Sequence, residues 1–252
     1  MVTGGSRGIG LAVARGLVAE GARVAVVARH EERLRAAAAE LGPEVLAVPA
    51  DTTDDAAVRT MVADVVDAWG GVDVLVNAAA QPAGGSVPAL EDLTDAEVDA
   101  DFDTKVLGYL RCARAVAPHM TAQGYGRIVN ISGLNARRTG SIAGSIRNIA
   151  VAALTANLAD ELGPSGVGVT VVHPGMVETE RTPRLVADRA AATGRTEEAV
   201  RADLAAGSSL RRLVTAEEVA DVVVFLCSPR AVAVTGDVAV GVGGGNRGAI
   251  HY

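Results

Sequence analysis

Aromatic residues and lysine are scarce in this chain of 252 residues. Phe, Trp and Tyr make up 2% of it, and lysine occurs once, as Lys105, among 23 basic residues. The hydrophobic core must therefore be built from Ala, Val, Leu and Ile, and no aromatic stacking signature narrows the choice of substrate. Because the chain otherwise uses arginine, its single lysine is a residue to examine.

Basic patches, paired cysteines and long apolar runs are missing as well. The formal net charge is −7 and there is no basic run, which argues against nucleic acid and anionic membranes as the main partners. Cys112 and Cys227 lie far apart and outside any CxxC spacing, which indicates buried thiols in a reducing compartment rather than a disulfide or a metal site. No apolar run approaches the roughly 18 residues of a membrane span, and no signal peptide opens the chain. These absences predict a cytoplasmic protein without a metal.

Apolar runs and helical patterns alternate along the chain. Hydrophobic residues make up 49% of it, and this length suits one domain, residues 1–252. Short apolar runs predict strands at Val2–Thr3, Arg23–Ala28, Glu44–Val48, Asp73–Asn77, Arg127–Ile131, Gly168–His173 and Asp237–Val240. Helical spacing predicts helices at Ile9–Glu20, Glu31–Leu41, Asp54–Trp69, Asp95–Thr121, Ser145–Leu162 and Thr215–Leu226. The pattern predicts an α/β fold of the Rossmann type, a doubly wound parallel sheet with helices on both faces.

Residues 175–209 break this alternation. They are polar and rich in arginine and alanine, and they lie between the sixth strand and the last helix. A long insertion at that place is either a mobile lid over a site or a plain surface excursion, and its position favours a lid.

A glycine-rich loop joins the first strand to the first helix. It reads Thr3-Gly4-Gly5-Ser6-Arg7-Gly8-Ile9-Gly10. The glycines allow a tight turn and let the backbone approach a pyrophosphate, which is attracted by the N-terminus of the following helix. The strand before the loop and the helix after it predict a dinucleotide site.

The end of the second strand indicates which dinucleotide to expect. A cofactor with a bare ribose usually meets an Asp or Glu about 20 residues after the glycines. Here the strand ends in Val26-Val27-Ala28-Arg29, without a carboxylate. Arg29, helped by Arg7, suits a 2′-phosphate, because a guanidinium binds phosphate through two parallel hydrogen bonds. We therefore expect NADP(H) rather than NAD, the alternative being that Arg29 is simply solvated.

With motifs further along the chain, the glycine loop resembles the short-chain dehydrogenase/reductase family. The loop matches TGxxxGxG, and Asp51-Thr52 match the family's pair at the adenine. Asn77-Ala78-Ala79 is similar to the NAG motif, with alanine in place of glycine.

The second half of the chain continues this likeness. Pro174-Gly175 and Thr179 match the PGxxxT segment at the nicotinamide, and Thr235-Gly236 with Gly243–Gly245 resemble the last strand and turn. The resemblance implies a seven-stranded parallel sheet, a nicotinamide cofactor, a small-molecule substrate, and a homodimer or homotetramer.

The active-site motif of that family is absent. Its members use a tyrosine as general acid, with a lysine four residues later, a serine and an asparagine. A phenol titrates near pH 10, so it exchanges protons at neutral pH only when a cation lies beside it. No tyrosine stands between Tyr125 and Tyr252, and no lysine follows Lys105. A standard mechanism of this family is therefore not supported.

Other residues stand at the four positions. The resemblance aligns Gly144 with the tyrosine, Asn148 with the lysine, and Lys105 with the asparagine on the fourth helix. Gly133 aligns with the serine, and Ser132 stands just before it.

Lys105, Ser132 and Asn148 are the remaining candidates for catalysis. A desolvated Lys105 would act as an acid, a base or a carbonyl anchor, and otherwise it is an ordinary, partly exposed side chain. Ser132 either turns inward to donate to a carbonyl or is satisfied by backbone at the strand end. Asn148 with Ser145 and Arg147 would form a polar cluster for an anionic group, although Ser145 is equally well a helix cap.

Three functions remain open at this point. The first is an NADP(H)-binding enzyme of the superfamily that acts on a small carbonyl or alcohol by redox or redox-neutral chemistry. The second is a catalytically silent pseudoenzyme or partner subunit, because all four positions have changed while the glycine loop is intact. In the third the site binds no dinucleotide, because a ribose-binding lysine is lost and Ala79 crowds the pocket.

Overall fold

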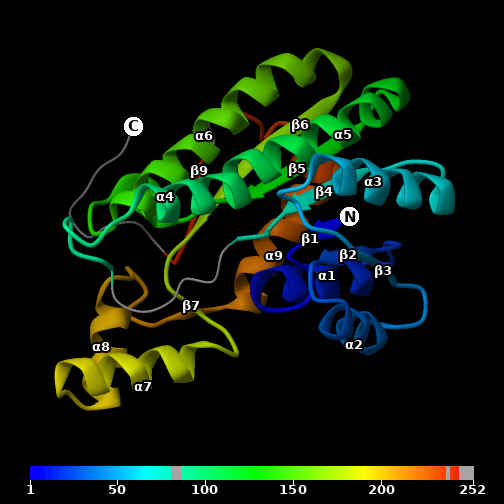
Figure 1. Cartoon of the computed structure of the whole chain (residues 1–252). Coiled ribbons are helices and arrows are strands. Elements are labelled where there is room, and N and C mark those ends of the chain that lie inside the picture. Colours follow the sequence, from blue (N-terminus) through cyan, green and yellow to red (C-terminus); the bar gives the residue numbers. More distant parts are fainter. Residues whose placement is uncertain (81–86, 237–238, 244–252) are drawn as a thin grey trace.

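A parallel sheet of seven strands lies at the centre of the computed structural model, which describes residues 1–80, 87–236 and 239–243 (Figure 1). The strand order is β3-β2-β1-β4-β5-β6-β9. Its members are β1 (Val2–Thr3), β2 (Ala25–Ala28), β3 (Leu46–Pro49), β4 (Val74–Asn77), β5 (Gly126–Ile131), β6 (Val167–Pro174) and β9 (Ala239–Val242). Because β1 pairs with both β2 and β4, the order reverses beside it, at the place where doubly wound folds bind nucleotides. The predicted fold class is confirmed.

Helices cover both faces of this sheet, as Figure 1 shows. They are α1 (Gly8–Ala19), α2 (Glu31–Leu41), α3 (Asp55–Trp69), α4 (Asp95–Phe102), α5 (Gly108–Gln123), α6 (Ile142–Leu162) and α9 (Ala216–Cys227). Side chains alternate between the faces along each strand. Val26 joins the apolar cluster of α1 and α9, while its neighbours Ala25 and Val27 join that of α3 and α5. This arrangement explains why the strands are apolar on both faces.

The segment predicted as one helix at Asp95–Thr121 contains a π-helical turn. The helix begins at Asp95, where Thr94 and Glu97 form a capping box. A π-helix, η1 (Asp103–Leu107), then separates α4 from α5. Lys105 lies in this turn, a conformation that is rare and often found at functional sites.

Helix α6 begins three residues before its predicted start at Ser145. Ser141 is its N-cap and accepts a hydrogen bond of 3.0 Å from the backbone N–H of Gly144. The suggestion that Ser145 is a cap is therefore wrong, and the Ser145 hydroxyl donates instead to the Arg138 carbonyl, 3.0 Å away.

One helix is longer and more apolar than we predicted from the sequence, where no apolar run approached the length of a membrane span. Residues Ile142–Ser165 are long and apolar enough to cross a membrane by length and composition, with a mean hydropathy of 1.3 over an 18-residue window. Core helices of α/β proteins pass the same test, and α6 packs along β6 of the sheet.

The insertion at 175–209 folds into a small helical unit. Strands β7 (Val177–Glu178) and β8 (Val214–Thr215) pair at its base, and α7 (Thr182–Thr193) packs against α8 (Glu197–Ala206). The two helices have a small apolar cluster of their own. Figure 1 shows them apart from the layers that cover the sheet.

Candidate active site

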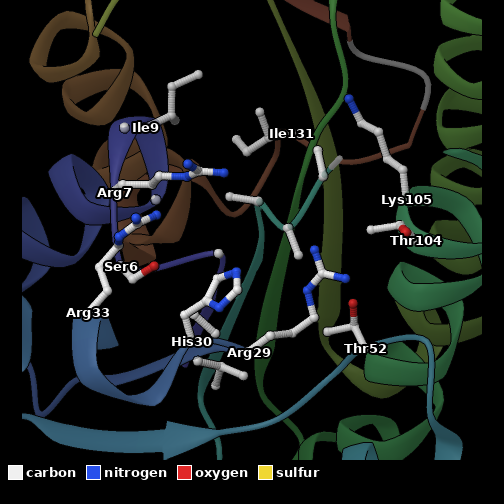
Figure 2. A pocket seen from close by; sticks show the side chains of 18 of the residues that line it. Ser6, Arg7, Ile9, Arg29, His30, Arg33, Thr52, Thr104, Lys105 and Ile131 are labelled. Atoms are coloured by element: carbon white, nitrogen blue, oxygen red, sulfur yellow. The ribbon is translucent and has the colours of Figure 1, made fainter. Parts of the chain in front are cut away.

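A pocket of about 500 Å³ opens at the carboxyl ends of β1, β2, β3, β4 and β5. Residues that follow β1 and β2, among them Ser6, Arg7 and Arg29, line one side of it. Lys105 lies across the pocket from them, as Figure 2 shows. The pocket thus contains both the predicted phosphate-binding loop and the one lysine of the chain.

The glycine loop is closely packed. A Cβ on Gly10 would lie 2.3 Å from the carbonyl oxygen of Gly4, and a Cβ on Gly4 would lie 2.8 Å from the backbone of Ala78. Gly8 has a φ of +53°, which favours glycine. Helix α1 starts at this loop without a side-chain cap or an acidic residue in its first turn. Its terminal N–H groups therefore suit an anionic ligand.

Arginines gather at the same end. Arg7, Arg29 and Arg33 all line the pocket, and Figure 2 shows Arg7 and Arg33 close together. Burial lowers the pKa of Arg7, and the charges of Arg181 and Arg33 lower it further. Mutually repelling cations of this kind favour the binding of an anion. Sequence reasoning missed Arg33, although its spacing of four residues from Arg29 was a usable signal.

Arg29 also has an acidic neighbour. One of its Nη atoms lies 3.7 Å from the Asp51 carboxylate, and both side chains are well exposed. An exposed pair at this distance contributes little free energy, so it does not prevent Arg29 from binding a phosphate.

Only one of the two residues predicted to contact the adenine lines the pocket. Thr52 lines the pocket. The other Asp51 carboxylate oxygen accepts hydrogen bonds from the Thr53 N–H, at 3.0 Å, and from the Thr53 hydroxyl, at 2.9 Å. Asp51 therefore shapes the turn after β3.

Among the remaining residues predicted to bind the cofactor, some line the pocket and others do not. Those that line the pocket include Gly4, Ser6, Gly8, Ile9, Gly10, Ala78 and Thr179. Asn77 is buried below it, where its Nδ2 donates to Asn130 Oδ1 at 3.0 Å and joins β4 to β5. Pro174 ends β6, and Gly175 borders a second pocket of about 240 Å³ beside α8.

Lys105 is held by two acceptors at the inner end of the first pocket. Its Nζ donates to the Ser132 carbonyl at 2.9 Å and to Asn148 Oδ1 at 3.0 Å, and the residue is 5% exposed. The pKa of Lys105 is lowered to about 7, mainly by burial and also by the charge of Arg147, while the charge of Asp101 acts in the opposite direction. Lys105 is thus no ordinary exposed lysine. The structure brings all three candidate catalytic residues together.

The Ser132 hydroxyl does not point a proton into the pocket. Its Oγ donates to the Asn148 carbonyl at 3.0 Å, so only its lone pairs are available to another group. A Cβ on Gly133 would lie 3.0 Å from Asn148 Nδ2. The Asn148 side chain therefore occupies the space in which a side chain at position 133 would begin.

The space at Gly144 is filled as well. A Cβ there would lie 2.8 Å from both Asn135 Nδ2 and the Ser141 hydroxyl. Tyr109, which lines the pocket, is no substitute acid. Its hydroxyl donates to the Ile131 carbonyl at 3.0 Å, and burial raises the pKa of this phenol above its ordinary value.

Comparison with known proteins shows the family of this chain. The family model described as short chain dehydrogenase matches residues 1–190. The chain belongs to that family. A short-chain reductase protein, NovJ, of Streptomyces niveus is 38% identical over 249 residues, covering 97% of this chain and 92% of NovJ. A sorbitol dehydrogenase of Cereibacter sphaeroides is 33% identical over 234 residues, covering 92% of this chain and 90% of that protein.

Solved structures of this family superpose along nearly the whole chain. The L-sorbose reductase of Gluconobacter frateurii, complexed with NADPH and L-sorbose, gives a TM-score of 0.90 at 29% identity, covering 99% of this chain and 96% of that one. An actinorhodin polyketide ketoreductase with NADPH gives 0.88 at 35% identity, covering 96% and 94%.

Proposed function

We propose that this member of the short-chain dehydrogenase/reductase family binds NADP(H) and acts on a small carbonyl or alcohol, with Lys105 as the proton-transfer group. The single observation that carries the proposal is the position of Lys105. Its amine lies in the same pocket as the glycine loop and the arginines, and it is fixed there by Ser132 and Asn148. The reaction is either a reduction or a redox-neutral rearrangement, since both need a proton moved at a carbonyl oxygen.

The residues at the outer end of the pocket fit NADP(H). The glycine loop and the uncapped start of α1 suit a pyrophosphate. Arg29 and Arg33, helped by Arg7, suit a 2′-phosphate. A reduced nicotinamide cofactor supplies a hydride for the carbonyl carbon. Two relatives whose structures were solved with NADPH support this choice.

The chemistry of Lys105 follows from its surroundings. An ordinary lysine is too weak an acid for efficient proton transfer at neutral pH, but the pKa of Lys105 is lowered to about 7, mainly by burial. Its ammonium donates a proton to the oxygen of the reacting carbonyl and becomes a neutral amine. Ser132 and Asn148 hold two of its N–H bonds, so the third position on Nζ is left for the substrate. They act as positioning residues.

Titration with NADPH and NADH tests the cofactor, followed by nicotinamide fluorescence and thermal stability. NADPH is expected to bind and stabilise the protein, with little response to NADH. Arg29→Ala and Arg33→Ala should each weaken NADPH binding on the order of tenfold, the effect of one charge-assisted hydrogen bond. Arg35→Ala, on the same helix but paired with Glu31, is the matched control and should change nothing. Absence of binding of either nucleotide at millimolar concentration would refute the proposal.

Lys105→Met tests the chemistry, because methionine keeps the length of the side chain and removes the amine. This variant should keep its affinity for NADPH and lose turnover by on the order of a hundredfold or more, the size expected for a general acid. Carbonyl substrates are screened for both reduced and redox-neutral products. Equal turnover in the variant and the wild type would rule Lys105 out.

A silent partner subunit is the second candidate, and two observations favour it. Positions 133 and 144 carry no side chain at all, and Ile142, Ile146 and Ile149 are half exposed on one face of α6. We propose that the chain forms a homodimer or homotetramer, or pairs with an active relative if it is silent. Native mass spectrometry of the purified protein separates these cases, and absence of turnover across the whole carbonyl screen would favour the silent subunit.

We also propose that the protein is located in the cytoplasm. Cys112 and Cys227 are buried free thiols, as expected in the reducing cytoplasm.

We also propose that α7 and α8 act as a lid over the substrate, as the position of residues 175–209 predicts.

A further inference from the structure

We propose that the ion pair between Asp101 and Arg147 is a positioning device that sets the charge of Lys105. The inference rests on the proposed function, since it concerns the group to which that function assigns proton transfer. Neither Asp101 nor Arg147 lines the pocket, so we assign them no direct contact with the substrate or the cofactor.

The pair joins α4, which precedes the turn that carries Lys105, to α6, which carries the Asn148 that holds its amine. Asp101 is on α4, four residues before Lys105, and Arg147 is on α6, directly before Asn148. An Nη atom of Arg147 donates to Asp101 Oδ2. The two side chains are only 18% and 17% exposed. Charges this deeply placed are weakly screened and act on a neighbouring amine more strongly than surface charges do.

The two charges act on Lys105 in opposite directions. Burial is the largest cause of the lowered pKa of Lys105; the Arg147 cation lowers it further and the Asp101 carboxylate raises it. Because Arg147 neutralises Asp101, the carboxylate cannot serve as a full counter-ion of the Lys105 ammonium. Without this pairing, an acid beside a buried lysine would keep the lysine charged at neutral pH.

The arginine is also incompletely satisfied. Its Nε is buried and has no hydrogen-bond partner among the residues that the structure describes. Burying a polar group in this state costs free energy, so the pair is not explained as a simple contribution to stability. A role in the electrostatics of Lys105 accounts for its position.

Arg147 and Asp101 are the charged groups that shift the pKa of Lys105, and the neighbouring polar side chains have partners of their own. Tyr109 on α5 is a neutral phenol that donates to the Ile131 carbonyl, and burial raises its pKa. His173 on β6 has its Nδ1 3.1 Å from the Gly133 carbonyl. Asp103, in the π-helical turn, is paired with Arg111 at 2.8 Å.

A single lysine makes the test direct. Protein labelled with ¹³C at lysine gives one lysine side-chain signal, whose chemical shift against pH reports the titration of Lys105. Arg147→Gln is expected to raise the pKa of Lys105, and Asp101→Asn to lower it, each by on the order of one pH unit. The double variant should return toward the wild type. Arg114→Gln, which removes an arginine of α5 that is paired with Asp55 on α3, is the control and should leave the titration unchanged.

A purely structural role for the pair predicts a different pattern. If Asp101 and Arg147 only fasten α4 to α6, both single variants and the double variant loosen the site and move the titration of Lys105 in the same direction. That result, or no movement at all, would overturn the inference. A wild-type Lys105 that titrates at the ordinary lysine value, about 10.4, would instead refute the proton-transfer role and with it the proposed function. Thermal melts identify any variant that fails to fold, and the remaining single variant still gives the sign.

Discussion

Asn148 Nδ2 lies 3.0 Å from the place where a Cβ of Gly133 would stand. The same asparagine accepts the Lys105 hydrogen bond through Oδ1 and Ser132 donates to its carbonyl. A side chain at position 133 would therefore press on the amide of Asn148 and, through it, disturb the position of Lys105.

Gly133→Ser should not restore the serine of the family at low cost. We expect the new Cβ to push against the Asn148 amide and lower the free energy of unfolding by about 1–3 kcal/mol, the range for overpacking. In an Asn148→Ala background the cost should be smaller, because the obstructing amide is gone. Urea unfolding of the four proteins of this double-mutant cycle measures the coupling, and strictly additive values would contradict the prediction.

Gly144→Ala and Gly207→Ala are expected to change the stability with opposite sign. In a helix, replacing glycine by alanine usually stabilises by up to about 1 kcal/mol. Gly207 caps the C-terminal end of α8 with a helical φ of −71°, and the nearest atom to a Cβ there is the Leu204 carbonyl oxygen at an ordinary 3.6 Å, so that substitution should stabilise. A Cβ on Gly144 would lie 2.8 Å from the Ser141 cap and from Asn135, so that substitution should destabilise. Melting temperatures of the two variants and the wild type test this prediction. If both substitutions stabilise the protein, the side chains of Ser141 and Asn135 must move to make room for the new Cβ.

Stability should rise with pH above about 7 because of Lys105. The pKa of Lys105 is lowered to about 7 in the fold, while an unfolded lysine titrates near 10.4. Between these values the unfolded chain binds the extra proton, so the free energy of unfolding gains at most about 1.4 kcal/mol per pH unit. Below pH 7 both states carry the charge and the folded state bears the full cost of its burial. Urea unfolding at pH 7 and pH 9 should show this slope in the wild type and not in Lys105→Met.

The rate of reduction should depend on the same group. Only the ammonium form of Lys105 can donate a proton, and its pKa is lowered to about 7. We expect kcat for reduction to fall about tenfold per pH unit at high pH, and the reverse oxidation, which needs the neutral amine, to gain. A Lys105→Arg variant stays charged over this range, so it should lack the inflection. A wild-type profile that is flat from pH 6 to pH 9 would contradict the assignment.

The fold could be predicted from the sequence because its signals are local and repeated. Runs such as Arg127–Ile131 are apolar on both faces, as strands under two layers of helices must be, and the glycine loop fixed the position of the pocket. The last predicted strand, Asp237–Val240, is found as β9 at Ala239–Val242, with positions 237 and 238 outside the described residues.

The arrangement of the site could be predicted only in part. Sequence reasoning named Lys105, Ser132 and Asn148 separately, but their contacts join three elements that are distant along the chain. Two local features of the structure made these contacts hard to predict from the sequence. The π-helical turn at Asp103–Leu107 has no simple sequence signature, and the cap at Ser141 moves the start of α6 away from Ser145.

The unit made by α7 and α8 has a consequence for the energetics of opening. Its apolar side chains, among them Val186 and Val200, pack on one another rather than in either cluster beside the sheet. One tether is the ion pair between Arg201 and Glu178, whose atoms lie 3.1 Å apart and whose side chains are partly exposed. Separating the unit from the sheet therefore breaks few buried contacts, and the backbone amides of α7 and α8 should exchange with solvent deuterium through a sub-global opening that leaves β5 and β6 protected. Opening of the lid that we propose would therefore leave the sheet, and the residues that the sheet holds at the site, in place.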